Sequence, residues 1–201
     1  MTRKTVFWSR TVAIAALAAS SLGIVGCLKA PDYSVVPEIS FNSITLTSIA
    51  GPRGANRKDS VSVVVNFQDG DGDLGLEGDR FGIASDSMNP FKRLKPDRIT
   101  PNRYYRNYFV DVFLKNRTTG IYEKLSANRL PNGDYNGRYP RLVSADTKPA
   151  PLKGTITRAL LFNYGTPFFG GDEVRFDITI ADRAFHESNT ITTGSIVIPP
   201  R

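Results

Sequence analysis

The chain has one cysteine, one histidine and one tryptophan in 201 residues. With Cys27 as its sole cysteine, it cannot form an internal disulfide, and with His186 as its sole histidine it cannot build a histidine-rich zinc site. It also lacks an apolar run of the roughly 20 residues that a bilayer-spanning helix needs. These absences exclude a disulfide scaffold and a polyhistidine metal centre, and they argue against a membrane-spanning helix.

The amino-terminal segment has the order of a signal peptide. Arg3, Lys4 and Arg10 form a basic region, and the run from Thr11 to Val25 is uncharged and almost wholly apolar or small. A basic region, a short apolar region and small residues before a cut are the parts of a secretory signal. We therefore predict a signal peptide over residues 1–26.

The residues Ile24-Val25-Gly26-Cys27 resemble the lipobox of bacterial, gram-negative lipoproteins. The resemblance implies cleavage before Cys27, a lipid on its sulfur and acylation, as with palmitate, of the new amino terminus. Several acyl chains make a stable anchor, whereas one is marginal. Leu28 follows where an inner-membrane retention signal often has Asp, so we expect the outer membrane, on a face that the sequence does not fix. The alternatives are an ordinary secretory signal or a buried thiol.

Much of the positive charge belongs to the signal. Residues 1–26 hold three of the 26 basic residues and no acidic ones, so 23 basic residues face 19 acidic ones afterwards, a net charge of +4. This charge is modest and dispersed, so we expect no nucleic-acid partner. The expected partners are membrane lipid through Cys27 and either an envelope protein or a glycan.

Strand patterns dominate after residues 27–38, which we predict to be a lipidated tether. In the valine-rich segment from Val61 to Phe67, every second residue is apolar and two of the three residues between them are polar, as in a half-buried strand. About seven such segments indicate an all-β protein with one antiparallel β-sandwich over residues 39–201. The expected strands are 39–46, 61–67, 108–115, 121–125, 155–162, 173–181 and 190–198.

The last two segments resemble the terminal hairpin of bacterial immunoglobulin-like domains, in which a strand ends at an Asp, here Asp182, before a polar loop. The resemblance covers residues 38–75 and 172–198 and implies an immunoglobulin-like sandwich with long inserted loops. These loops are 82–105 and 126–152, and such loops are often functional. They place tyrosines that could stack on a sugar, which makes a glycan-binding module the alternative function. The candidate stacking residues are Tyr104, Tyr105, Tyr108, Tyr135 and Tyr139.

The sharpest chemical motif is Asp69-Gly70-Asp71-Gly72-Asp73-Leu74-Gly75, directly after the valine-rich strand. Three carboxylates at alternate positions can converge on one hard cation, and calcium accepts such oxygen ligands flexibly. The motif begins like an EF-hand loop but has Leu74 at position six and Arg80 at position twelve. We therefore predict a calcium loop flanked by strands.

Sandwich topology places the loop after the second strand and the loop between the last two strands at one pole. We therefore expect Asp182, with Asn189 or Glu187, to join Asp69, Asp71 and Asp73 as metal ligands. The alternative is an Asp-Gly turn with hydrogen-bonded side chains and no metal. The motif also resembles a feature of uncharacterised lipoproteins with immunoglobulin-like or cadherin-like domains, which implies a calcium-rigidified structure without a known activity.

The residue inventory argues against an enzyme. Only His186 could serve a Ser-His-Asp triad, no Gly-x-Ser-x-Gly elbow is present, and no glycine-rich phosphate loop joins a strand to a helix. Paired carboxylates of the glycosidase type stay open, because sequence does not show their separation. We expect a lipid-anchored cell-envelope protein that is a non-catalytic structural or binding module.

Overall fold

The chain divides into two compact units, residues 1–31 and 32–201. The expected signal peptide, Cys27 and most of the 82–105 loop lie outside the residues that the structure describes, and no helix within the described ranges is long and apolar enough to cross a membrane. The computed structural model describes residues 31–51, 57–76, 103–130, 134–144 and 146–200.

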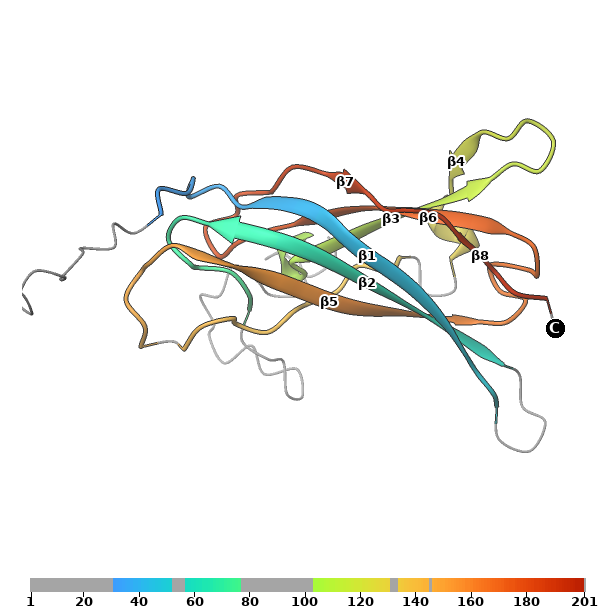
Figure 1. The fold of residues 1–201 in the computed structure, drawn as a ribbon, viewed down its shortest axis with the longest axis horizontal. Helices are drawn as coiled ribbons and strands as arrows, with labels where there is room; N and C mark the ends of the chain where they lie inside the picture. The colour runs from blue at the N-terminus through green and yellow to red at the C-terminus, as the bar shows by residue number, and fades with distance from the viewer. Residues whose placement is uncertain (1–30, 52–56, 77–102, 131–133, 145, 201) are drawn as a thin grey trace, which may run out of the picture. The chain divides into compact units, whose positions relative to one another are not determined.

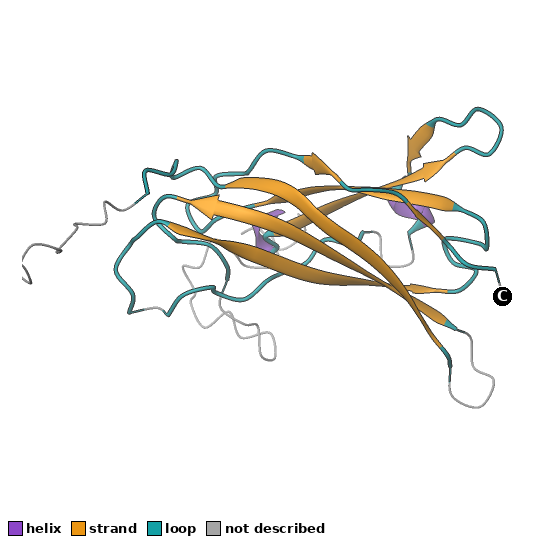
Figure 2. Ribbon diagram, viewed as in Figure 1, coloured by secondary structure: helices purple, strands orange, loops and turns teal. Residues whose placement is uncertain are grey.

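The second unit is an antiparallel β-sandwich, as the alternation patterns predict (Figures 1 and 2). One sheet has the strand order β1-β2-β5, and the other has the order β4-β3-β6-β7 with β8 also pairing with β6. The first, second and fifth strands therefore share one sheet, and the third and sixth pair in the other. The strands are β1 (Glu38–Ile49), β2 (Lys58–Asp69), β3 (Tyr108–Lys115), β4 (Tyr122–Lys124), β5 (Leu152–Asn163), β6 (Glu173–Ile180), β7 (Ile191–Thr192) and β8 (Ile196–Val197).

The expected last strand over 190–198 is wrong in one respect, because it is split into β7 and β8. Thr192 pairs with Asp177 and Ile196 pairs with Val174, so residues 193–195 oppose only residues 175–176. An extra residue on one strand is a β-bulge, which interrupts the ladder. Within the bulge the side-chain oxygen of Thr193 accepts a hydrogen bond from the Phe176 amide at 3.0 Å.

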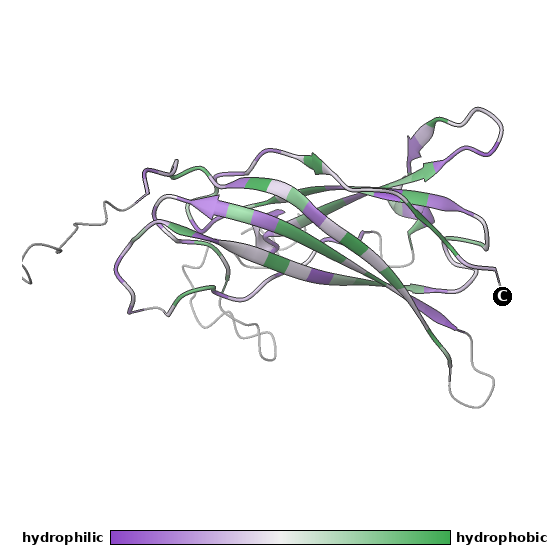
Figure 3. Cartoon of the chain, in the orientation of Figure 1, coloured by the Kyte–Doolittle hydropathy of each residue, from purple (hydrophilic) through white to green (hydrophobic). Residues whose placement is uncertain are grey.

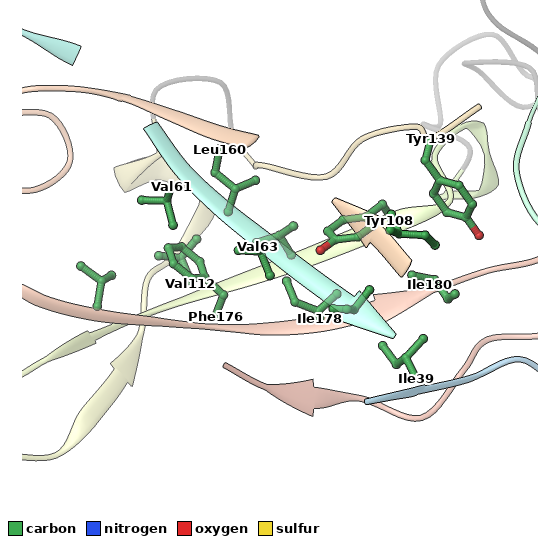
Figure 4. Close-up of a cluster of buried hydrophobic side chains, with 14 of the residues drawn as sticks. Ile39, Val61, Val63, Tyr108, Val112, Tyr139, Leu160, Phe176, Ile178 and Ile180 are labelled. Atoms are coloured by element: carbon green, nitrogen blue, oxygen red, sulfur yellow. The ribbon is translucent and has the colours of Figure 1, made fainter. Parts of the chain in front are cut away.

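The core lies between the two sheets and follows the period of the strands. Alternate residues of β2 and β6 are buried in the core, among them Val63 and Phe176, while the residues between them are half-buried (Figure 4). Figure 3 shows hydrophobic and more hydrophilic residues in bands along the strands. Fully buried side chains from β2, β3 and β6 meet in this layer. The layer contains Val61, Val63, Val65, Tyr108, Val112, Val174, Phe176, Ile178 and Ile180.

We expect Phe176→Ala to lower the free energy of unfolding of residues 32–201 by about 3–5 kcal/mol, because it removes a ring from a fully buried site. The unit holds the whole described core, so urea unfolding of this fragment is the measurement. The exposed Thr157→Ala serves as control, with an expected change below about 0.5 kcal/mol. Equal losses for the two variants would show that Phe176 is not a core residue.

Candidate metal site at the end of strand β2

Two strands carry a carboxylate to the same pole of the sandwich. The inward positions of β2 end with Phe67 and Asp69, and those of β6 lead through Ile180 to Asp182. The period of two therefore turns both carboxylates toward the core, where Asp69 is 0% exposed and Asp182 is 1% exposed. A bridge between Leu74 and Asp182 joins the loops that follow the two strands.

The loop after β2 curls so that its three carboxylates converge. Gly72 and Gly75 have φ values of 71° and 89°, a conformation that glycine adopts readily. Within the curl, the amide of Asp73 donates a hydrogen bond to Asp69 Oδ2 at 3.1 Å. Side-chain oxygens of Asp69, Asp71 and Asp73 lie within 4.8 Å of one another. This geometry brings together three of the five predicted metal ligands.

Neighbouring segments hold the loop on two sides. The amide of Gly70 donates to the carbonyl oxygen of Ser34 at 2.7 Å, just before β1, and the amide of Ala150 donates to the carbonyl of Asp71 at 3.1 Å. A Cβ at Gly72 would lie 2.6 Å from the Ala150 carbonyl oxygen. The glycines therefore permit both the turn and the close approach of these two segments.

The cluster is electrostatically strained. Burial, followed by the charges of Asp71 and Asp73, raises the pKa of Asp69 to about 7. Burial and the charge of Asp182 also raise the pKa of Asp73, against the opposing charge of Arg183. One oxygen of Asp69 and one of Asp73, both Oδ1, are buried and have no hydrogen-bond partner within the described part of the chain. Each such acceptor costs about 1–3 kcal/mol, which a cation between them would offset.

Asp182 lies beside the cluster, but its carboxylate forms hydrogen bonds within its own loop. Its Oδ1 accepts a hydrogen bond from the amide of His186 at 2.8 Å, and its Oδ2 lies 2.8 Å from Nδ1 of the same residue. The hydrogen bond with Asp182 also raises the pKa of His186. The predicted pole is therefore correct for Asp182, although its two oxygens already have partners.

Asn189 and Glu187 bind elsewhere at this pole. The side chain of Asn189 accepts from the amide of Ile39 at 2.8 Å and donates to the carbonyl of Ile39 at 2.9 Å. Glu187 forms an ion pair with Arg103, with 2.7 Å between Oε1 and Nε. Asn189 therefore ties the last loop to β1, and neither side chain is placed among the three converging carboxylates.

The five tyrosines of the glycan alternative do not form an exposed row. Tyr108 and Tyr139 are 0% and 6% exposed, and both belong to the core. Tyr135 packs against the core as well, and Tyr104 and Tyr105 are half-buried. A stacking platform needs exposed ring faces, so this arrangement removes the feature that favoured a sugar ligand.

A pocket of about 300 Å³ lies next to the carboxylate loop. Its second wall comes from residues 143–144 and 147–152, which end at the first residue of β5 and which the sequence marks only as part of a long loop. This wall brings Lys148 to the pocket, and the loop after β6 brings Arg183. Sequence reasoning missed both cations, because no local pattern connects either of them with the loop after β2.

Comparison with protein-family models, with curated proteins and with solved structures found no match to this chain.

The pKa of Asp69 predicts a pH dependence for the metal-free protein. Its folded pKa of about 7 exceeds the ordinary value of 3.8, so protonation favours the folded state and stability falls as pH rises from about 4 to about 7. In the presence of chelator, we expect the free energy of unfolding of the parent protein to fall by roughly 2–4 kcal/mol over this range because of Asp69. The Asp69→Asn variant should lack this contribution.

The measurement is urea unfolding of both proteins at several pH values. Their difference isolates Asp69 from the other titrating groups. If the difference in unfolding free energy between the two proteins stays constant from pH 4 to pH 8, the raised pKa of Asp69 in the folded state is wrong.

Proposed function

We propose that this chain is a lipid-anchored protein of the bacterial cell envelope, a non-catalytic structural or binding module whose β-sandwich is stabilised by calcium at one pole. The observation that carries the calcium site is the buried, unpartnered Oδ1 of Asp69 within a cluster of three carboxylates. A cation there would satisfy this acceptor and relieve the repulsion that raises the pKa of the carboxyl.

The donor set favours calcium over softer or stricter metals. Asp69, Asp71 and Asp73 offer oxygen atoms only, and the sole histidine is bonded to Asp182. Calcium takes six to eight oxygens in flexible geometry, whereas magnesium needs a near-ideal octahedron. An irregular loop of carboxylates fits the more flexible ion.

The contacts of the histidine support a non-catalytic protein. His186 is held by Asp182, and the nearby hydroxyl of Ser188 is already bonded. The Ser188 hydroxyl donates a hydrogen bond to the carbonyl of Asn189 at 2.8 Å and accepts one from the amide of Ile180 at 3.1 Å. These contacts stabilise a turn, and they do not present a serine nucleophile to the histidine.

The anchor is supported by the sequence. Basic residues, an uncharged run and Ile24-Val25-Gly26-Cys27 occur in the order of a lipoprotein signal. Residues 31–37 then precede β1 without regular strand or helix, which suits a linker between a lipidated terminus and a fold. Outer-membrane placement rests on Leu28.

Calcium should raise the melting temperature of residues 32–201. A ligand at a hundredfold excess over its Kd stabilises the folded state by about 2.7 kcal/mol. We expect Asp71→Asn to abolish the rise and Asp111→Asn to retain it, because Asp111 lies on β3 in an exposed pair with Lys124. Melting followed by circular dichroism, with calcium or chelator, gives the answer. No shift at millimolar calcium would overturn the calcium site.

The anchor is tested separately in cells. We expect the full chain, expressed in a gram-negative host, to incorporate labelled palmitate and to sediment with membranes. Cys27→Ser should lose both properties, because it removes the only thiol. Ser21→Ala, within the apolar run, is the matched control and should behave as the parent chain. Palmitate labelling that survives Cys27→Ser would contradict lipidation at this residue.

A further inference from the structure

The pocket beside the carboxylate loop has two chemically different walls. Asp71 and Asp73 lie on one side, and Arg183 also borders it. The segment before β5 supplies two hydroxyls and an exposed ammonium group. These are Ser144, Thr147 and Lys148.

Asp69 lies behind this pocket and not on its lining. It is fully buried at the end of β2, while Asp71 and Asp73 border both the pocket and the cluster. A cation among the three carboxylates would therefore have Asp69 on its interior side and the pocket on the other. Three carboxylates supply between three and six oxygens, and calcium takes six to eight. The remaining ligands would come from the pocket side.

A divalent cation would reverse the charge of this region. When all three carboxylates are ionised, they outnumber Lys148 and Arg183 by one formal charge, so the empty site is net negative above the pKa of Asp69, about 7. Calcium would leave it with one net positive charge. An anion would therefore be repelled from the empty site and attracted to the occupied one.

We propose that this pocket binds a phosphate group in a calcium-dependent manner, an inference that rests on the proposed calcium site. Phosphate oxygens are good ligands for calcium, and lysine, arginine and hydroxyl groups are their usual partners in proteins. The volume of about 300 Å³ leaves room for a phosphate together with the group that it esterifies.

The phosphate can come from two sources. The amide of Gly70 in the same loop contacts Ser34, so the chain enters the fold beside this site (Figure 1). An anchored protein would hold such a pole near lipid headgroups. A soluble phosphate monoester is the other source, and the same pocket chemistry would recognise it.

The test uses residues 32–201 in a phosphate-free buffer. Calorimetry measures binding of glycerol 3-phosphate with calcium and with chelator, and sedimentation measures binding to phosphatidylcholine vesicles with and without phosphatidic acid. We expect binding only with calcium. Lys148→Ala should weaken it about tenfold, while Lys153→Ala, an exposed lysine outside the pocket, should leave it unchanged.

The outcomes separate this inference from the calcium site. Binding of glycerol 3-phosphate supports the pocket with a soluble ligand, and binding to phosphatidic acid vesicles alone supports it with a lipid. A calcium-induced rise in melting temperature without binding to either probe would overturn the phosphate pocket and leave the calcium site standing. Absence of the rise would overturn both, and binding insensitive to Lys148→Ala would overturn the pocket.

Discussion

The register of β2 determines much of this structure. Its inward positions continue from the buried valines through Phe67 to Asp69, so the strand that builds the core also buries a carboxylate. Exposing Asp69 by a shift of one residue would turn every inward valine to solvent. Since that shift would expose the apolar face of the strand, the charge stays inside, and the loop that follows must accommodate it.

Strands β2 and β6 each bury a carboxylate, but the two carboxylates differ in their hydrogen-bond partners. On β6, the period that buries Ile180 also buries Asp182, but the amide and ring of His186 satisfy both oxygens. The amide of Asp73 donates to Asp69 Oδ2, but Asp69 Oδ1 is buried without a hydrogen-bond partner among the residues that the structure describes. This asymmetry is why a cation is proposed beside Asp69 and why Asp182 is a neighbour of the site.

The fold could be largely predicted from the sequence, because alternation in β2 and β6 is a local signal. The site could be predicted only in part. Glycines between carboxylates indicate convergence within one loop, and sandwich topology correctly brings Asp182 near it. The hydrogen bond between Asn189 and Ile39 and the position of Lys148 at the pocket depend on long-range packing, which no local pattern encodes. Likewise, tyrosines in apparent loops contribute to the core, because aromatic rings fit either environment.

The contact between Asn189 and Ile39 has a consequence for self-association. Strand β1 is an edge strand, and unpaired main-chain groups on such a strand recruit other chains into aggregates. The carboxamide of Asn189 occupies both the amide and the carbonyl of Ile39, as a neighbouring strand would. The side chain of Asn189 therefore covers the edge of the sheet at Ile39. The amide and carbonyl of Ile39 are not available to pair with a strand from another molecule.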